Sequence, residues 1–224
     1  RIFLAPGNHD FYAPGSGYSA VEWPENVHIF TGNLDYVDVP ALDCRVYGAG
    51  YRSMDCPGLL RGFRAEGDAR WCVGVLHGDP LTLSSPCCPV TAAQVRESGL
   101  DYLALGHVHA PSAMNRAGNT VWAYPGCPQG RGFDELGDKG FLMGEVDKGS
   151  VKLRFIPFAR RRYEILTVDV TEQEPLAAIR AAGKAGIVVR RRHIVLSLLF
   201  VLDTIDAILL WRILRRAEKE RKQE

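Results

Sequence analysis

Three short apolar segments of the sequence each end in side chains that bind metal ions. They lead into Gly7-Asn8-His9-Asp10, into His77-Gly78-Asp79 and into Gly106-His107-Val108-His109. Imidazole nitrogen, amide oxygen and carboxylate oxygen together suit manganese, iron or zinc. A single histidine after a strand is usually structural, and we interpret His28 and His193 in that way. Three such clusters in one chain predict a metal site.

The apolar segments themselves are typical of buried strands, because each is short and bounded by glycine, proline or asparagine. We expect strands at residues 2–4, 27–31, 44–47, 71–76, 102–105 and 120–124, and a hairpin formed by 141–146 and 151–156. A short helix is expected at 90–98, capped near Thr91 and stopped by Gly99. Sites of α/β sheets lie at the carboxyl ends of strands, where we expect the three clusters to meet.

The spacing inside the clusters leaves two points open. His107 and His109 are two residues apart, so they would point the same way on a strand and can diverge in a turn beyond it. Asp79 is either a support for a metal ligand or a simple turn residue. The glycines beside Asn8, His77 and His107 leave room for backbone to pass close to a metal ion or phosphate.

Composition excludes several classes of protein. The 224 residues carry a net charge of +1, and 46% are hydrophobic and 24% charged, which is ordinary for a globular protein and unlike a histone-like one. Local basic patches for nucleic acid stay possible. The six cysteines form no C-x-x-C pair, so we expect reduced thiols and a cytoplasmic location instead of a zinc ribbon or disulfide scaffold.

Three regions follow one another along the chain. Residues 1–158 form the expected core, and residues 159–185 are a linker and the start of a smaller domain. In this second region we expect a strand at 163–170 and a helix at 171–184 that is capped by Thr171. Residues 186–224 hold an apolar run, 194–214, between basic flanks. It fits a partner-binding or buried helix, a membrane helix opposed by Asp203 and Asp206, or a segment that does not continue the natural chain.

The order GNHD, HGD, GHVH resembles the last three sequence blocks of the calcineurin-like metallophosphoesterases. The segment from Tyr124 to Gly140, YPGCPQGRGFDELGDKG, is similar to a stretch of the bacterial SbcD-like and YhaO-like DNA repair exonucleases. The resemblance covers about residues 1–170. It implies an α/β (α+β) fold, a metallophosphoesterase β-sandwich flanked by helices with the start of a small capping domain.

The same resemblance implies a site with two divalent metal ions, manganese first and iron or zinc as alternatives. Asn8, His77 and His107 match ligands of one ion, and His109 matches a ligand of the other. By the same matching, His9 contacts the scissile phosphate and protonates the leaving oxygen, with Asp10 orienting it. Arg131 and Lys139 either contact substrate phosphates or stabilise their own loop, and residues 160–162 either face DNA or form a solvated linker.

The sequence also departs from the family. The family places a D-x-H block and a GD block ahead of the first motif, and neither block stands ahead of Gly7-Asn8-His9-Asp10 in these 224 residues. We therefore expect an N-terminally truncated core, lacking its first strands, that is inactive by itself. The segment from about residue 186 does not resemble the capping domain.

The expected function is metal-dependent phosphodiester hydrolysis, as a DNA exonuclease in repair that works with an SbcC-like coiled-coil ATPase. The resemblance also implies a homodimer as one option, because members of the family are typically dimeric. We do not expect a membrane location. One alternative is a phosphoesterase for nucleotides or cyclic nucleotides. Another is a scaffold without catalysis, in which the helix at 194–214 binds a partner or membrane.

Overall fold

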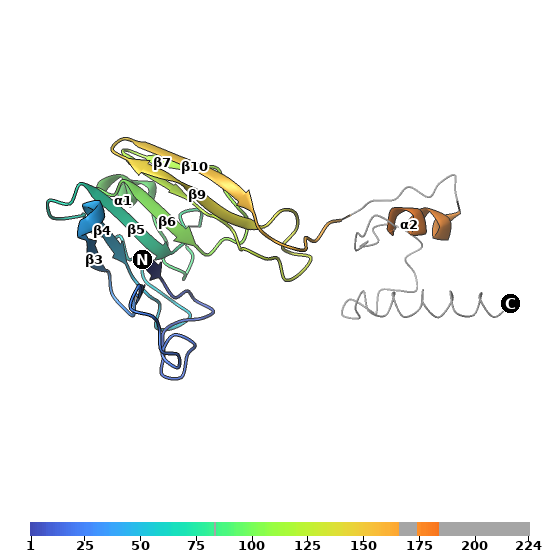
Figure 1. The fold of residues 1–224 in the computed structure, drawn as a ribbon, viewed down its shortest axis with the longest axis horizontal. Coiled ribbons are helices and arrows are strands. Elements are labelled where there is room, and N and C mark those ends of the chain that lie inside the picture. Colours follow the sequence, from blue (N-terminus) through green and yellow to red (C-terminus); the bar gives the residue numbers. More distant parts are fainter. Residues whose placement is uncertain (83, 166–173, 184–224) are drawn as a thin grey trace. The chain divides into compact units, whose positions relative to one another are not determined.

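The computed structural model describes residues 1–82, 84–165 and 174–183 (Figure 1). The chain divides into two units, each described separately. The core unit comprises Arg1–Gly130 and Asp138–Arg161, and the second unit comprises Arg131–Gly137 and Arg162–Glu224. The segment predicted at 194–214 and the predicted cap Thr171 lie outside the described residues.

A six-stranded mixed sheet is the main element of the core unit. Its strands are, in sheet order, β3 (Asp35–Val39), β4 (Cys44–Gly48), β5 (Trp71–His77), β6 (Tyr102–Gly106), β8 (Thr120–Ala123) and β7 (Asn115–Ala117). The four central strands run parallel, and both edge strands run antiparallel to their neighbours. The parallel order brings the carboxyl ends of β5 and β6 to the same edge of the sheet.

Two further strand pairs complete the core unit. β1 (Ile2–Leu4) pairs in parallel with β2 (Val27–Ile29), and β9 (Gly140–Asp147) forms a hairpin with β10 (Ser150–Pro157). The amide of Tyr51 donates to the carbonyl of Pro6, which ties the loop after β1 to the loop after β4. This bond places the Asn8 segment beside the main sheet.

Short helices connect the strands. The 3-10 helix η1 (Pro40–Leu42) joins β3 to β4, and α1 (Ala92–Glu97) precedes β6. Thr91 caps α1 through a complete capping box with Gln94, and Gly99 follows with a positive φ of 71°. Val95 of α1 is fully buried and packs into the core with the apolar side chains of β5 and β6.

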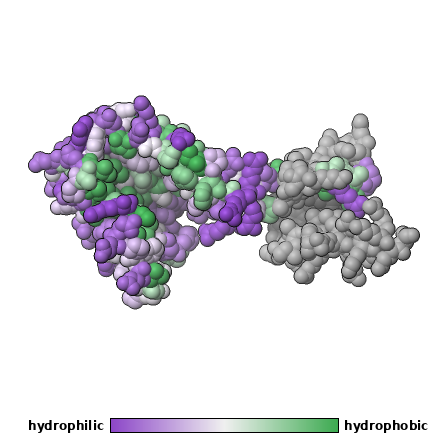
Figure 2. Space-filling view, viewed as in Figure 1, coloured by the Kyte–Doolittle hydropathy of each residue, from purple (hydrophilic) through white to green (hydrophobic). Residues whose placement is uncertain are grey.

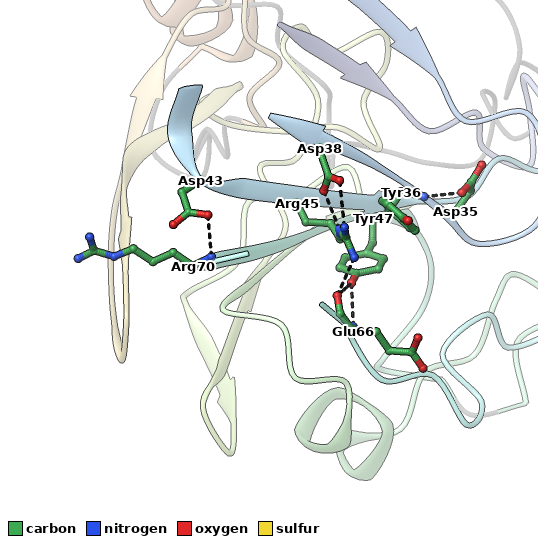
Figure 3. Close-up of polar contacts among 8 residues, drawn as sticks. All are labelled: Asp35, Tyr36, Asp38, Asp43, Arg45, Tyr47, Glu66 and Arg70. Carbon is green, nitrogen blue, oxygen red and sulfur yellow. Dashed lines mark hydrogen bonds and ion pairs between the residues drawn. The ribbon is translucent and has the colours of Figure 1, made fainter. Parts of the chain in front are cut away.

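The edge formed by β3 and β4 is held by one arginine. Arg45 donates to both carboxylate oxygens of Asp38 on β3, at 2.6 and 2.9 Å, and to the carbonyl of Glu66 at 2.8 Å (Figure 3). Its guanidinium also lies 3.9 Å from the ring centroid of Tyr36. Tyr47 binds the backbone of Glu66 at both its amide and its carbonyl. The long loop before β5 is thereby fixed to the sheet edge.

The hairpin meets the sheet through Lys148, which lies in its turn. Lys148 Nζ lies 2.9 Å from the carboxylate of Asp101, and that carboxylate also accepts from the amide of Cys72. On the outer face of the hairpin, Phe141 and Met143 remain exposed. Apolar surface is present in separate patches among polar surface on the face of the molecule in view (Figure 2).

The second unit is described at 131–137, 162–165 and 174–183. Leu136 forms a bridge with Tyr163, whose ring packs edge-on against Phe133 at 5.2 Å. The helix α2 (Pro175–Gly183) starts later than the 171–184 predicted. The carboxylate of Glu174 accepts from the amides of Leu176 and Ala177. Glu174 is therefore the residue that caps this helix. Pro175 fits at the first helical position, because an N–H group there would have no partner inside the helix.

The six strands predicted between residues 2 and 124 and the predicted hairpin are present, with ends that shift by one or two residues. Of the strand predicted at 163–170, Tyr163 forms an isolated bridge with Leu136, and residues 166–170 lie outside the described residues. Strands β3 and β7 were not predicted. Both are edge strands with polar sequences, DYVDV and NRA, which lack the apolar run of a buried strand. Among the described residues, no helix has the length and apolar character needed to span a bilayer.

Candidate metal centre

The three predicted clusters converge at one edge of the core unit. His77 is the last residue of β5 and pairs in register with Gly106, the last residue of β6. His107 therefore begins the turn directly after β6. Asn8 lies four residues beyond β1 and is buried with 8% of its surface exposed. An amide and two imidazoles that are distant in sequence are thus neighbours.

Asn8 and His77 are in direct contact. The Oδ1 atom of Asn8 lies 2.8 Å from Nε2 of His77. The ring of His77 meets the ring of His107 edge-on, with centroids 5.2 Å apart and planes at 74°. The ring of Tyr51, itself 1% exposed, packs edge-on on His77 at 5.2 Å. His77 is therefore held at the centre of the cluster.

Burial is the main cause that lowers the pKa of His77 to about 4, and the neighbouring His107, with smaller contributions from His9 and His109, acts in the same direction. The carboxylate of Asp10 acts in the opposite direction. His77 is consequently neutral throughout the physiological pH range. A neutral imidazole keeps a nitrogen lone pair for a metal ion.

Two glycines make room for His77. A Cβ added to Gly7 would lie 2.5 Å from Nδ1 of His77, and one added to Gly106 would lie 3.2 Å from the same atom. The first separation is shorter than side-chain atoms tolerate, so only glycine fits at position 7 with His77 in place. Both glycines therefore leave room for the imidazole of His77. Their role in letting backbone pass close to a metal ion or phosphate stays a prediction.

The turn after β6 has unusual backbone geometry. His107 has φ of 118°, a region that glycine adopts readily and other residues rarely. Its Nε2 lies 3.8 Å from Oδ2 of Asp79. The other carboxylate oxygen of Asp79 accepts from the amides of Leu81 and Thr82. Asp79 therefore closes its own turn, which is one of the two functions considered for it, and its support of His107 as a metal ligand stays a prediction.

His9 and Asp10 lie on the open side of the cluster, and both are exposed. Asp10 accepts from the amide of Gly7 at 2.8 Å and from the hydroxyl of Tyr18 at 2.5 Å. Burial and this hydrogen bond raise the pKa of Tyr18 far above its ordinary value, so the hydroxyl stays a donor. Asp10 is thus fixed by two donors beside His9.

Tyr18 was not singled out from the sequence. It lies in a loop rich in glycine, serine and proline, and such a loop gives no signal of a specific hydrogen bond to Asp10. Tyr124 was quoted only within the family-like segment. Its buried hydroxyl donates to the carbonyl of Gly78 at 2.6 Å, which supports the turn that carries His77 and Asp79.

Lys139 and Arg131 belong to different units and differ in burial. Lys139 is 3% exposed, and its ammonium donates to the carbonyl of His109 at 2.9 Å. This contact is the loop-stabilising alternative of the two considered for Lys139. The side chain of His109 is exposed, next to the cluster. Arg131 is exposed in the second unit, where its backbone binds Glu135 and Tyr163.

The donor atoms fit a divalent metal ion. Two ligand atoms each about 2.1 Å from an ion, at right angles, lie about 3 Å apart, and Asn8 Oδ1 and His77 Nε2 are separated by 2.8 Å. A neutral imidazole, a second imidazole and an amide oxygen form a donor set of intermediate softness. The residues present therefore fit the class of ion that the sequence predicted.

A mixed α/β unit with histidine, asparagine and aspartate at its strand ends is the arrangement of a metallophosphoesterase, and the comparisons agree. The chain is 32% identical over 188 residues, 80% of its length, to the "Uncharacterized metallophosphoesterase YhaO" of Bacillus subtilis (strain 168). It is 31% identical over 100 residues, 41% of its length, to the "DNA double-strand break repair protein Mre11" of Methanopyrus kandleri. No protein-family model matches the sequence.

The chain is thus similar in sequence to a metallophosphoesterase and to an Mre11 protein, and its own fold is mixed α/β with few helices. It covers 45% of the length of the Bacillus protein and 22% of the Methanopyrus protein, so it spans less than half of either curated relative.

Proposed function

We propose that this chain belongs to a metal-dependent phosphodiesterase that degrades DNA from an end during repair. The observation that carries the proposal is the convergence of Asn8, His77 and His107 at the carboxyl ends of their strands, with Asn8 Oδ1 2.8 Å from His77 Nε2. Similarity to the Methanopyrus DNA double-strand break repair protein favours DNA over small nucleotides as substrate.

In this proposal, Asn8, His77 and His107 hold one divalent ion and His109 contributes to a second, manganese being the first choice. Such ions supply positive charge to the phosphate oxygens and lower the pKa of bound water. His9, whose side chain is exposed, contacts the scissile phosphate and gives a proton to the leaving oxygen. Asp10, fixed by Gly7 and Tyr18, orients His9.

We further propose an SbcC-like coiled-coil ATPase as partner and the cytoplasm as location, both from the sequence resemblance. Arg131 stays a candidate phosphate contact, because its side chain is exposed. For Lys139 we favour the support of the His109 loop, because its ammonium is already engaged there.

The test uses the full protein that the gene encodes, with manganese and with end-labelled double-stranded DNA. We expect stepwise shortening of the DNA in the wild type and a loss of at least 100-fold in His77→Ala. His28→Ala is the matched control, because His28 lies on β2 outside the cluster and should leave the rate unchanged. Release of phosphate from nucleotides, or ring opening of cyclic nucleotides to linear phosphomonoesters, without cleavage of DNA, would instead favour the small-substrate alternative.

A further inference from the structure

A hollow of about 670 Å³ opens next to His9. Its walls are residues 9–11 and 13–18, with Val21 and Trp23 closing one side. Sites for small molecules and for parts of larger ligands have volumes of this order. Because His9 and Asp10 belong to its lining, a ligand whose phosphate contacts His9 has the hollow directly beside it.

The lining is aromatic. Phe11, Tyr18 and Trp23 face the hollow, and the rings of Tyr18 and Trp23 are stacked with centroids 6.4 Å apart and planes at 23°. Trp23 is 39% exposed and Val21 is 55% exposed. Exposed aromatic surface beside a polar site is typical of a place where a flat ring binds.

The polar atoms of the two stacked rings are already used. The indole Nε1 of Trp23 donates to the carbonyl of Tyr18 at 3.0 Å, and the hydroxyl of Tyr18 donates to Asp10. These rings therefore offer a ligand aromatic surface that is not occupied by the partner ring, and not their hydrogen-bonding groups. A site of this kind binds any aromatic heterocycle with little regard to its edge pattern.

Internal hydrogen bonds hold the loop together. The hydroxyl of Ser19 donates to the carbonyl of Ala13 at 2.7 Å, and the amide of Ala20 donates to the carbonyl of Ser16 at 2.9 Å. Lysine, arginine and glutamate are absent from the lining. A neutral ring thus suits the hollow, with any negative charge of the ligand directed toward His9.

We propose that this hollow is the subsite for the base of the nucleotide whose phosphate is cleaved, with Trp23 as its stacking residue. The inference rests on the proposed function and adds to it the part of the substrate that lies outside the metal centre. Stacking without edge recognition accepts all four bases, as an enzyme that shortens DNA of any sequence requires.

The first measurement uses the full protein and DNA ends whose terminal nucleotide has either a normal base or no base. We expect kcat/KM to be about 5- to 150-fold higher with the base present in the wild type, and we expect this ratio to fall close to one in Trp23→Ala. Trp23→Phe keeps an aromatic ring and should restore most of the ratio. Trp71→Phe, at the opposite end of β5 from His77, is the matched control and should keep all of it.

A second measurement needs no hydrolysis. DNA with 2-aminopurine at its end is mixed with the protein in a chelator, where we expect stacking to quench the fluorescence in the wild type and not in Trp23→Ala. Equal base dependence and equal quenching in the wild type and in Trp23→Ala would overturn the inference while leaving DNA hydrolysis intact. Absence of DNA hydrolysis in the wild type would overturn the proposed function, and with it the inference that rests on it.

Discussion

At the scale of single residues, the site depends on how His77 is surrounded. It contacts Asn8 and His107. The ring of Tyr51 packs against it, and the backbone at Gly7 passes close to it. The charged form of His77 is disfavoured by burial and by its histidine neighbours. The same features that prepare His77 to bind a metal ion therefore make its protonation costly.

The pH dependence of folding should report this cost. The pKa of His77 is about 4 in the folded chain and near 6.5 when unfolded, so between these values only the unfolded chain takes up the proton. Stability contributed by His77 is complete above pH 6.5 and is lost as the pH falls toward 4. Allowing for partial solvent screening, we expect a loss of roughly 1–2 kcal/mol.

Urea denaturation of the metal-free chain at pH 7.5 and pH 4.5 measures the effect. The fall in unfolding free energy from pH 7.5 to pH 4.5 should be smaller in His77→Asn than in the wild type by roughly 1–2 kcal/mol. His28→Asn serves as control and should retain the wild-type fall. An equal fall in His77→Asn and in the wild type would contradict the prediction.

Tyr18 is a positioning residue, because it acts on His9 only through Asp10. Tyr18→Phe removes the hydroxyl that Asp10 accepts and keeps the ring that lines the hollow. We expect kcat for DNA to fall about 10-fold, as after loss of a hydrogen bond behind a catalytic group, with KM nearly unchanged. Tyr36→Phe, on the exposed face of β3, should change neither constant. A rise in KM without a fall in kcat would show that Tyr18 serves binding alone.

The residues of the centre were all named from the sequence, but the contacts that support them were not: Tyr18 was not singled out, and Lys139 was named with its role left open. Asn8, His77 and His107 follow apolar strands in a recognisable order, so their convergence at strand ends could be predicted. Tyr18 and Lys139 act through a hydroxyl and an ammonium on partners eight and 30 residues away. No periodicity or motif marks such contacts, because they depend on how loops fold back.

At the scale of elements, the sequence predicted strands well where a strand is buried and poorly where it lies at an edge. β5 and β6 are apolar and central, whereas β3 and β7 carry polar residues and pair on one side. The start of α2 was misjudged, because Thr171 and Glu174 looked like a capping box while Glu174 itself caps the helix before Pro175. Two acceptable caps close together cannot be ranked from sequence alone.

The contact between the β1 loop and the end of β5 gives a prediction at this scale. Gly7→Ala places a methyl group 2.5 Å from His77, so the loop or the imidazole must move. We expect the affinity for manganese to fall by about 10- to 100-fold, the range seen when ligand positions are disturbed. Gly17→Ala is the matched control, because a Cβ there meets no atom within 4 Å.

Calorimetric titration of the full protein with manganese measures both variants. Wild-type affinity in Gly7→Ala would show that the two segments are not held together as closely as the structure indicates.

At the scale of the whole core unit, the hairpin is tied to the sheet at Asp101. This carboxylate is 11% exposed and binds both Lys148 and the amide of Cys72, whereas Lys148 is 54% exposed. Removing the exposed partner should cost less than about 1 kcal/mol, since surface ion pairs contribute little. Removing the carboxylate also leaves the Cys72 amide without this acceptor, which we expect to cost about 1–3 kcal/mol.

Urea denaturation of Asp101→Ala and Lys148→Ala tests this ranking, with Lys152→Ala on the same hairpin as the control. The added loss in Asp101→Ala should persist in high salt, because a hydrogen bond to a buried amide is screened less than an exposed ion pair. Equal losses of unfolding free energy in Asp101→Ala and Lys148→Ala would contradict this ranking.

The backbone conformation at His107 has one more consequence, which concerns thermal stability and metal binding together. A non-glycine residue at φ of 118° stores strain, of the order of 1–3 kcal/mol. His107→Gly should therefore raise the thermal midpoint of the metal-free chain while weakening its hold on manganese. Selection for thermal stability alone would favour glycine at this position. The difference in stability between the wild type and His107→Gly therefore measures the free energy that the protein loses by keeping an imidazole there.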